Sequence, residues 1–449
     1  MKQTLLQIYF NIFKILAKIY LFRNPAYIIW VTWSIWKTSC RMIINDVLKN
    51  NLEDKKVYTS EKNFNWELWM SLSILWISSY KPELKSVIET ILKSLKIAFL
   101  SKKLYDVIIL EYWIDHPGEM DFLLSIAKPN IWVITKIDKV HSLQFSSPEI
   151  TASEKYKLLI WSKDFAFINL DDEYFDKYEN KIQNKIYFNT NLETPKNEEI
   201  KWENYKLIQD NWNIKSYFDL FFQGEKKAFV SSNLIWAENV SYISLWFKIL
   251  DLINIHFYKK SFFPENIKEI NINFKLQPSR FSIFSWINEN LIIDSSYNAA
   301  PMSVRKIILN TLDIQENFFS DYKKIFCLWE MRELWTFAKK EHEELAEFVF
   351  WKAEFVFVVW ESMKKYFLPK MLELWFDSEK AIYFEDSFKL WEYLRSFLLN
   401  SENKHLILFK WSQNTIFLEE AIKFILAYKV DESNLCRQDS YWLGKKWVK

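Results

Sequence analysis

The chain has 449 residues, half of them hydrophobic, and its 59 basic and 57 acidic residues leave a net charge of +2. This length fits two or three domains, and the balanced charge gives no reason to expect nucleic acid as a partner. The three cysteines, Cys40, Cys327 and Cys436, are too widely spaced for a disulfide framework or a zinc site, which favours a reducing, cytoplasmic location.

The balance between glycine and tryptophan is unusual. The chain has 3 glycines and 23 tryptophans, whereas an average chain of this length has roughly 31 glycines. Turns and helix C-termini need positive φ angles, which glycine adopts without strain. We therefore interpret many tryptophans as positions of glycine, as would arise if UGA codons that the organism reads as glycine were translated as tryptophan. We expect these positions in loops after strands or at helix edges; they are Trp30, Trp33, Trp36, Trp69, Trp113, Trp236, Trp329, Trp335, Trp360 and Trp411. The alternative is a protein that is genuinely rich in tryptophan.

The first predicted element is a helix over residues 4–22. Its polar residues Gln7, Asn11, Lys14 and Lys18 recur at spacings of four, three and four, which places them on one face of an amphipathic helix. These polar residues make the stretch unsuited to cross a membrane, and it lacks a signal-peptide cleavage site. We expect it to pack on the domain that follows, and the alternative is a peripheral contact with a membrane surface.

Residues 27–39, YIIWVTWSIWKTS, predict a strand, a loop and the start of a helix. With glycine at positions 30, 33 and 36 the stretch reads G-x-x-G-x-x-G-K-T, which is typical of a loop whose backbone N–H groups bind phosphate. We expect ATP to bind here, with Lys37 at the phosphates and Thr38 as a ligand of Mg²⁺. The residues predicted to contact the nucleotide in this loop are Trp33, Ser34, Trp36, Lys37, Thr38 and Ser39.

Six further segments complete a pattern when glycine is read for tryptophan. They are NFNWELWM at 63–70, IILEYWIDHPGE at 108–119, PNIWVITKIDKVHS at 129–142, DSSYNAAP at 294–301, LWEMRELW at 328–335 and LFKWSQNTIFLE at 408–419. Together with the loop, and in this order, they resemble the motifs of the Mur ligase family, whose members join amino acids or dipeptides to the cell-wall precursor. The last three segments are most similar to the branch that adds D-alanyl-D-alanine, and the resemblance covers residues 27 to 430.

Candidate magnesium ligands follow the strands of the predicted central domain. Glu111 ends the apolar stretch DVIILE, and a carboxylate at a strand end suits Mg²⁺; a structural salt bridge is the alternative. The resemblance implies that His141 binds a second Mg²⁺, and that Lys155 is carbamylated by CO₂ and helps to hold that ion, with Lys157 as the alternative. It thereby implies three catalytic residues, Lys37, His141 and Lys155.

The remaining site residues are also implied by the resemblance. Asn239 takes the place of the adenine contact, although Glu238 and Tyr242 beside it differ from the family pattern. Beyond residue 260, apolar and helical stretches alternate, which predicts an open α/β sheet. In this part the resemblance implies nucleotide contacts by Arg280 and Asp294, and substrate contacts by Asn298, Lys410 and Ser412.

We therefore expect an α/β protein with an N-terminal amphipathic helix (1–26), a phosphate-loop Mur ligase central domain (27–260) and a Rossmann-like C-terminal domain (261–449). The resemblance implies a monomeric ATP-dependent amide ligase that activates a carboxylate of a muramyl peptide precursor as an acyl phosphate and joins it to an amino acid or dipeptide. It also implies that the UDP-binding domain with which family members normally begin is missing. Two alternatives stay open: a ligase of the same fold with another acceptor, such as a poly-amino-acid or folate-like substrate, and a non-catalytic ATP-binding module.

Overall fold

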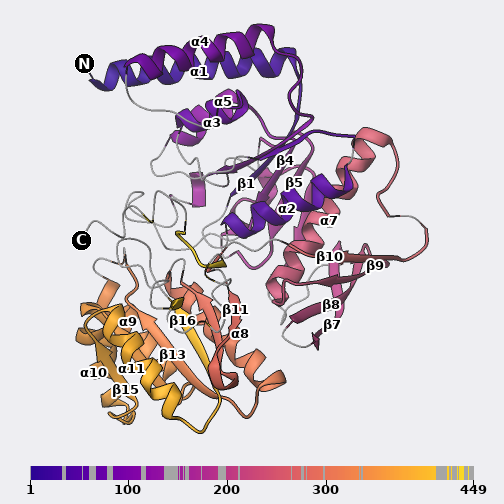
Figure 1. The fold of residues 1–449 in the computed structure, drawn as a ribbon. Coiled ribbons are helices and arrows are strands. Elements are labelled where there is room, and N and C mark those ends of the chain that lie inside the picture. The colour runs from indigo at the N-terminus through magenta and orange to yellow at the C-terminus, as the bar shows by residue number, and fades with distance from the viewer. Residues whose placement is uncertain are drawn as a thin grey trace. The chain divides into compact units, whose positions relative to one another are not determined.

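The computed structural model divides into two units, residues 1–274 and 275–449, and each unit is described by itself (Figure 1). The structure describes residues 2–32, 37–52, 54–59, 67–77, 84–112, 118–135, 150, 152–154, 156, 161–172, 174–190, 199–210, 213–263, 265–274, 278–279, 281–296, 299–332, 334, 337–410, 422–423, 426, 432, 434–438 and 443.

A six-stranded parallel sheet forms the centre of the first unit. Its strand order is β2-β3-β1-β4-β5-β6, with β1 at Tyr27–Thr32, β2 at Val57–Thr59, β3 at Val107–Tyr112, β4 at Ile131–Ile134, β5 at Phe165–Asn169 and β6 at Lys185–Phe188. β1 pairs with β3 on one side and with β4 on the other. The chain passes from β1 to the edge strand β2, and after β3 it crosses back to the other side of β1, to β4. In open α/β sheets ligands bind beyond the carboxyl ends of the strands where the strand order reverses in this way.

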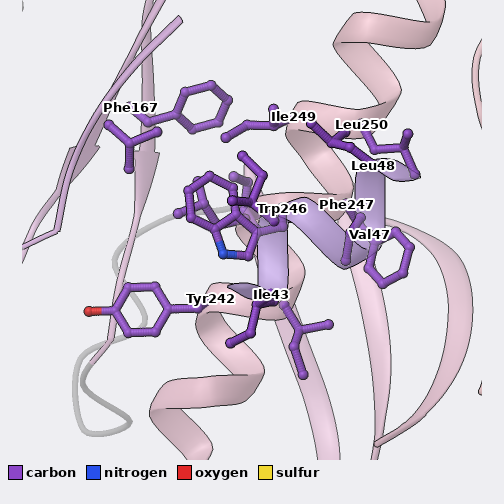
Figure 2. Close-up of a cluster of buried hydrophobic side chains, with 14 of the residues drawn as sticks. Ile43, Val47, Leu48, Phe167, Tyr242, Trp246, Phe247, Ile249 and Leu250 are labelled. Carbon is purple, nitrogen blue, oxygen red and sulfur yellow. The ribbon is translucent and has the colours of Figure 1, made fainter. Parts of the chain in front are cut away.

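Helices cover both faces of this sheet because alternate strand residues are apolar on both sides. Ile28 and Trp30 of β1 pack with α1 (Lys2–Arg23), α3 (Glu67–Ile74), α4 (Leu84–Leu100) and α5 (Glu119–Ile126). Ile29 and Val31 pack instead with α2 (Lys37–Asn51) and α7 (Ala237–Tyr258). Figure 2 shows the second core, in which Trp246 of α7 lies among side chains of α2 and β5.

A second, four-stranded sheet of order β10-β9-β8-β7 completes the first unit. β7 (Ile200–Asp210), β8 (Asn213–Phe222) and β9 (Glu225–Ser232) are antiparallel, and β10 (Lys268–Ile272) runs parallel to β9. Two short 3₁₀ helices, Phe175–Lys177 and Glu179–Lys181, precede β6. Because β10 pairs with β9, the first unit extends to residue 274, beyond the expected boundary at 260.

The second unit is an open α/β sheet of order β11-β12-β16-β13-β14-β15. Only β11 (Ser282–Ser285) is antiparallel among its strands; β12 (Leu291–Ser295), β13 (Lys323–Trp329), β14 (Phe355–Val359), β15 (Ala381–Phe384) and β16 (His405–Lys410) are parallel. The helices are α8 (Pro301–Phe318), α9 (Ala338–Val349), α10 (Leu368–Glu373) and α11 (Ser387–Asn400), with a 3₁₀ turn at Ile287–Glu289 and a π turn at Met363–Phe367. The predicted α/β class is therefore confirmed in both units.

The N-terminal helix α1 packs on the rest of the first unit, as expected. Phe13, Leu16, Ala17 and Tyr20 are buried against the layer that contains α3, α4 and α5. The hydroxyl of Tyr20 also accepts a hydrogen bond from the backbone N–H of Leu104 at 2.9 Å. The helix is thus part of this unit rather than a separate segment. Of the helices described, none has both the length and the apolar character to cross a membrane.

Three tryptophans have left-handed backbone conformations. The φ angles are +51° at Trp76, +86° at Trp360 and +65° at Trp375. Trp76 and Trp375 each follow a helix, and both make the pair of hydrogen bonds of a Schellman motif. After α3, Trp76 N–H donates to Ser73 O at 3.0 Å and the next N–H donates to Leu72 O at 2.9 Å.

The second of these helix ends repeats the same geometry. Trp375 N–H donates to Leu372 O, and Phe376 N–H donates to Met371 O, both at 3.0 Å. This position of a Schellman motif is ordinarily glycine, because a side chain at positive φ strains the backbone. Sequence reasoning identified only Trp360 of the three as a glycine position.

The other tryptophans read as glycine lie in varied places. Trp30 is inside β1, Trp69 is inside α3, Trp236 precedes α7 with φ of −106°, and Trp329 ends β13. None of these four has a positive φ. The expectation that they occupy loops after strands or helix edges holds only for Trp236, because Trp30 and Trp329 lie in strands and Trp69 lies in a helix. Trp33, Trp36, Trp113, Trp335 and Trp411 lie outside the described residues.

Candidate functional site

The carboxyl edge of the central sheet carries the predicted phosphate loop. β1 ends at Thr32 and α2 begins at Lys37, so the strand–loop–helix arrangement is as predicted. Trp33, Ser34 and Trp36 lie outside the described residues, and for Lys37, Thr38 and Ser39 the structure gives the backbone only. These last three residues form the first turn of α2, where backbone N–H groups lack partners within the helix and can bind a phosphate.

Glu111 lies at the same edge as the loop. In the parallel pair of β1 and β3 it is the register partner of Val31, two residues before the loop begins. Its backbone position is therefore that expected of a magnesium ligand at a strand end, while its side chain is not described. On the other side of β1, β4 ends at Ile134 and is followed by the buried Thr135. His141, the predicted second ligand, lies outside the described residues.

Hydrogen bonds of polar side chains connect the segments at the carboxyl ends of β4, β5 and β6. Asn169, the last residue of β5, donates from its amide nitrogen to the backbone oxygen of Thr135 and, at 3.3 Å, to the hydroxyl of Thr190. Asp171 accepts from the backbone N–H and from the hydroxyl of Thr190, at 2.6 and 2.9 Å. These bonds hold the loop regions beyond three strands in a defined arrangement at the edge where the nucleotide is expected.

The structure describes neighbours of Lys155 but not Lys155 itself. Residues 152–154 and 156 are helical, Ala152 and Tyr156 are buried, and Lys155 itself lies outside the described residues, as does Lys157. Burial, reinforced by the nearby Asp172, raises the pKa of the Tyr156 hydroxyl. Glu154 is a buried carboxylate that sequence reasoning did not single out, and it accepts a hydrogen bond of 3.4 Å from the N–H of Gly118. It connects this segment to the loop before α5.

The predicted adenine contact, Asn239, lies in the first turn of α7. It is 8% exposed, and Trp236 caps the helix in an extended conformation. α7 packs on α2, so Asn239 and Lys37 lie on neighbouring helices of the first unit.

In the second unit, Asp294 lies near the carboxyl end of β12 and is fully buried. One carboxylate oxygen accepts from the Ser279 hydroxyl at 2.6 Å and the other from the Ser296 N–H at 3.0 Å. Ser279 has a φ of +60°, a conformation that glycine adopts more easily than serine. Arg280 and Asn298, the neighbouring predicted contacts, lie outside the described residues.

Lys410 joins the same edge. It is the last residue of β16 and pairs in register with Ser295 of β12 on one side and Leu328 of β13 on the other. Its ammonium group is buried and donates to the backbone oxygen and to the hydroxyl of Ser295, both at 3.3 Å. The structure thus brings Asp294 and Lys410 to adjacent strand ends, while Ser412 lies outside the described residues.

Two further polar residues at this edge were missed by sequence reasoning. Glu330 directly follows β13, is 8% exposed, and accepts hydrogen bonds from Arg332 Nε at 3.1 Å and Ser362 Oγ at 2.7 Å. His342 of α9 accepts from Met331 N–H at 3.0 Å, and its Nδ1 lies 2.7 Å from Ala338 O. Burial lowers the pKa of His342, so the ring is neutral with its proton on Nδ1. The segment LWEMRELW could have pointed to Glu330, because this carboxylate directly follows an apolar strand.

Among the side chains that the structure describes, no cluster of three or more His, Cys, Asp or Glu could hold a metal ion. The predicted ligands Thr38 and Glu111 are described by their backbones alone, and His141 and Lys155 are not described. Mg²⁺ prefers oxygen ligands, which the hydroxyl of Thr38 and the carboxylate of Glu111 offer, whereas the imidazole of His141 offers nitrogen. Lys155 would offer oxygen only in the carbamylated form that the resemblance implies.

Comparison with known proteins identifies the central part of the chain. Residues 31–243 match the Mur ligase middle domain. A UDP-N-acetylmuramoyl-tripeptide–D-alanyl-D-alanine ligase of Borreliella burgdorferi is 24% identical over 331 residues, which cover 71% of this chain and 58% of that protein. A ligase of the same name from Rickettsia prowazekii is 24% identical over 351 residues, covering 76% and 67%. The chain therefore spans less than two thirds of the length of the first relative.

Solved structures agree on the fold. A crystal structure of MurF from Acinetobacter baumannii gives a TM-score of 0.67 at 15% identity, covering 92% of this chain and 79% of that one. MurF from Thermotoga maritima in complex with ADP gives 0.64 at 19% identity, covering 94% and 84%. The fold is similar to that of the central and C-terminal domains of these ligases.

Proposed function

We propose that this chain, whose residues 31–243 match the Mur ligase middle domain, is an ATP-dependent amide ligase of peptidoglycan precursor synthesis. One observation carries the proposal: Lys37 opens α2 directly after a loop at the end of β1, and Glu111 is the register partner of Val31 on the neighbouring strand. A helix start, where backbone N–H groups can bind phosphate, and an acidic strand end therefore share one sheet edge, at the point where the strand order reverses, which supports the proposal.

The proposed reaction is the activation of a carboxylate by ATP. Phosphoryl transfer to a carboxylate depends on positioned positive charge, since negative charge spreads over the transferred group. Lys37 and the N–H groups at the start of α2 would hold the phosphates, and Mg²⁺, when bound, would supply further charge compensation. Thr38 and Glu111 are the proposed ligands of one ion, and His141 and Lys155 of the second.

The second unit would receive the amine. Lys410 and Asp294, which lie on adjacent strand ends, together with Arg280, Asn298 and Ser412, are the proposed contacts to the nucleotide and the incoming substrate. The curated relatives are named for joining D-alanyl-D-alanine to a muramoyl tripeptide. We propose the same pair of substrates here.

A product assay tests this function. The chain with glycine at positions 30, 33 and 36 should release ADP from ATP only when Mg²⁺, the UDP-linked muramoyl tripeptide and D-alanyl-D-alanine are all present. Lys37→Ala should lower the rate on the order of 10²–10³-fold, whereas Lys49→Ala, an exposed lysine in the last turn of the same helix, should leave it unchanged. ADP release that needs no muramoyl substrate would point to another acceptor.

We also propose that native glycines stand at many of the tryptophan positions. The Schellman motifs at Trp76 and Trp375 support this, as does the φ of +86° at Trp360, because these conformations are strained for any residue with a side chain. The composition of 3 glycines and 23 tryptophans supports it independently. Gene sequencing decides the matter: UGA codons at positions 76, 360 and 375 are expected, and UGG codons there would contradict the proposal.

A further inference from the structure

Helix α4 carries large apolar side chains on its solvent side. Ile88, Leu92, Leu95 and Phe99 are 51, 61, 38 and 49% exposed, and their spacings of four, three and four place them in one stripe along the helix. Leu100, 74% exposed, continues the stripe at the end of the helix. Single exposed apolar residues are ordinary on a protein surface, but a continuous apolar stripe is typical of a surface that binds another protein or a membrane.

The inner side of α4 is built from small side chains. Thr90, Ser94 and Ala98 recur every four residues and are buried on the side that packs against α1, with Ile91 and Ile97 partly buried beside them. The two hydroxyls donate to backbone oxygens one turn earlier, at 2.6 and 2.7 Å. A surface helix normally turns its largest apolar side chains to the core. In α4 most of them point outward, so core packing does not account for the stripe.

Helix α1 lies beside α4 and extends the same layer (Figure 1). The guanidinium of Arg23 donates to the backbone oxygen of Ala98 at 2.6 Å, which joins the C-terminal ends of the two helices. α1 exposes Ile15 and Phe22, 54 and 88%, and these residues are seven positions apart and therefore share one helix face. α1 thus adds two exposed apolar side chains from its C-terminal half to the layer.

This layer is also strongly basic. α1 and α4 contain seven basic residues and one acidic residue, although the chain as a whole is balanced. Lys18, Lys93 and Lys96 are exposed within the helices, and Lys102 and Lys103 follow α4 directly. Exposed leucine and phenylalanine with lysine beside them are typical of helices that lie in the headgroup region of an anionic bilayer.

We propose that α4, supported by α1, docks the first unit on an anionic lipid surface. The stripe of Ile88, Leu92, Leu95 and Phe99 enters the boundary between headgroups and acyl chains, and the lysines contact lipid phosphates. This differs from the alternative considered for residues 4–22, a membrane contact by that helix itself, because α1 buries much of its apolar face and α4 exposes its own. Neither helix contains tryptophan, and the proposal is independent of the ligase reaction.

Sedimentation of the full chain with lipid vesicles tests the proposal. The chain should bind vesicles that contain phosphatidylglycerol, bind pure phosphatidylcholine much less, and lose binding as salt is raised. Leu92→Asp and Phe99→Asp should each weaken binding by on the order of tenfold or more. Lys93→Gln and Lys96→Gln should each weaken it about fivefold.

The matched control is Leu309→Asp, which changes a similarly exposed leucine on α8 of the second unit (48% exposed). It should leave vesicle binding unchanged, and circular dichroism should show that all variants are folded. Equal binding to both kinds of vesicle, or an equal loss in the control, would overturn the proposal. A third outcome would also overturn it: the unaltered chain binds no vesicles but forms an oligomer, and Leu92→Asp dissociates that oligomer. The stripe would then be an interface between copies of the chain.

Discussion

At the scale of single residues, the backbone at the tryptophans is the most informative feature. Trp76 and Trp375 adopt left-handed conformations after helices, and their side chains are 52 and 92% exposed. Their indoles therefore gain little from packing, while the positive φ strains the backbone. The composition alone predicts that glycines are replaced but not at which positions. The helix-end geometry favours Trp76 and Trp375, because a side chain strains the backbone only at particular φ angles.

Replacing these residues should stabilise the chain. Trp76→Gly and Trp375→Gly should each raise the free energy of unfolding by roughly 1 kcal/mol, since the left-handed strain is relieved. The control is Trp351→Gly, because Trp351 is 85% exposed but does not have a positive φ; it should not stabilise. Urea denaturation of the three variants measures this, and equal stabilisation by all three would show that the backbone conformation is not the cause.

Lys155 separates the proposed mechanism from that of a simple ATPase. An unmodified lysine would be repelled by Mg²⁺, whereas a carbamate would be attracted to it. Lys155→Ala should therefore lose most ADP release, on the order of 10²–10³-fold, with partial recovery on addition of short carboxylates. Lys155→Arg keeps the positive charge and should stay inactive.

The comparison with Lys157→Arg identifies which lysine is modified. This variant should retain activity if Lys155 carries the carbamate. Wild-type turnover by Lys155→Arg would instead show that Lys155 is an ordinary surface residue of its helix.

At the scale of elements, the strands and the strand ends were the most predictable features. The stretches IIW, VIILE, LIID and LILF are short and mainly apolar, and each lies in a parallel strand. The polar edge of the second unit was predicted only in part. Lys410 and Asp294 were identified, whereas Glu330 and His342 act through partners 32 and 11 residues away in sequence, Ser362 and Met331. Single-sequence patterns carry no information on such pairs.

The start of β16 provides a test by pH. His405 is buried and shares Asn290 Oδ1 between its backbone N–H at 2.7 Å and its Nδ1 at 3.1 Å. Burial lowers the pKa of His405 to about 4, from 6.5. Between these pH values the unfolded chain binds a proton that the folded chain does not bind, so stability should fall as pH falls through this range.

The expected slope from this residue is at most about 1.4 kcal/mol per pH unit. Urea denaturation of the unaltered chain and of His405→Gln, from pH 7 to pH 4, isolates it, because other titrating groups contribute to both. Parallel profiles for the two proteins would show that His405 does not titrate in this way.

At the scale of the whole molecule, the α/β class and the similarity to Mur ligases were both predictable from sequence, because seven motifs occur in the expected order. The extent of the first unit could not be predicted, because β10 joins the sheet of β7–β9 by pairing with β9. A five-residue strand with alternating exposure is difficult to recognise from sequence alone. The outward stripe of α4 was also not anticipated. Its sequence is amphipathic, and only the structure shows that the small side chains face inward.

The central claim is that ATP activates a carboxylate at the edge formed by β1, β3 and α2. Positional isotope exchange measures this directly, with ATP that carries heavy oxygen in the bridge between its β- and γ-phosphates. In the glycine form of the chain, the UDP-linked muramoyl tripeptide without any amine should cause the label to move to non-bridging positions, because acyl phosphate forms and reverses. Glu111→Ala should abolish the exchange. No exchange with the muramoyl substrate, in protein that binds ATP and Mg²⁺, would contradict the account.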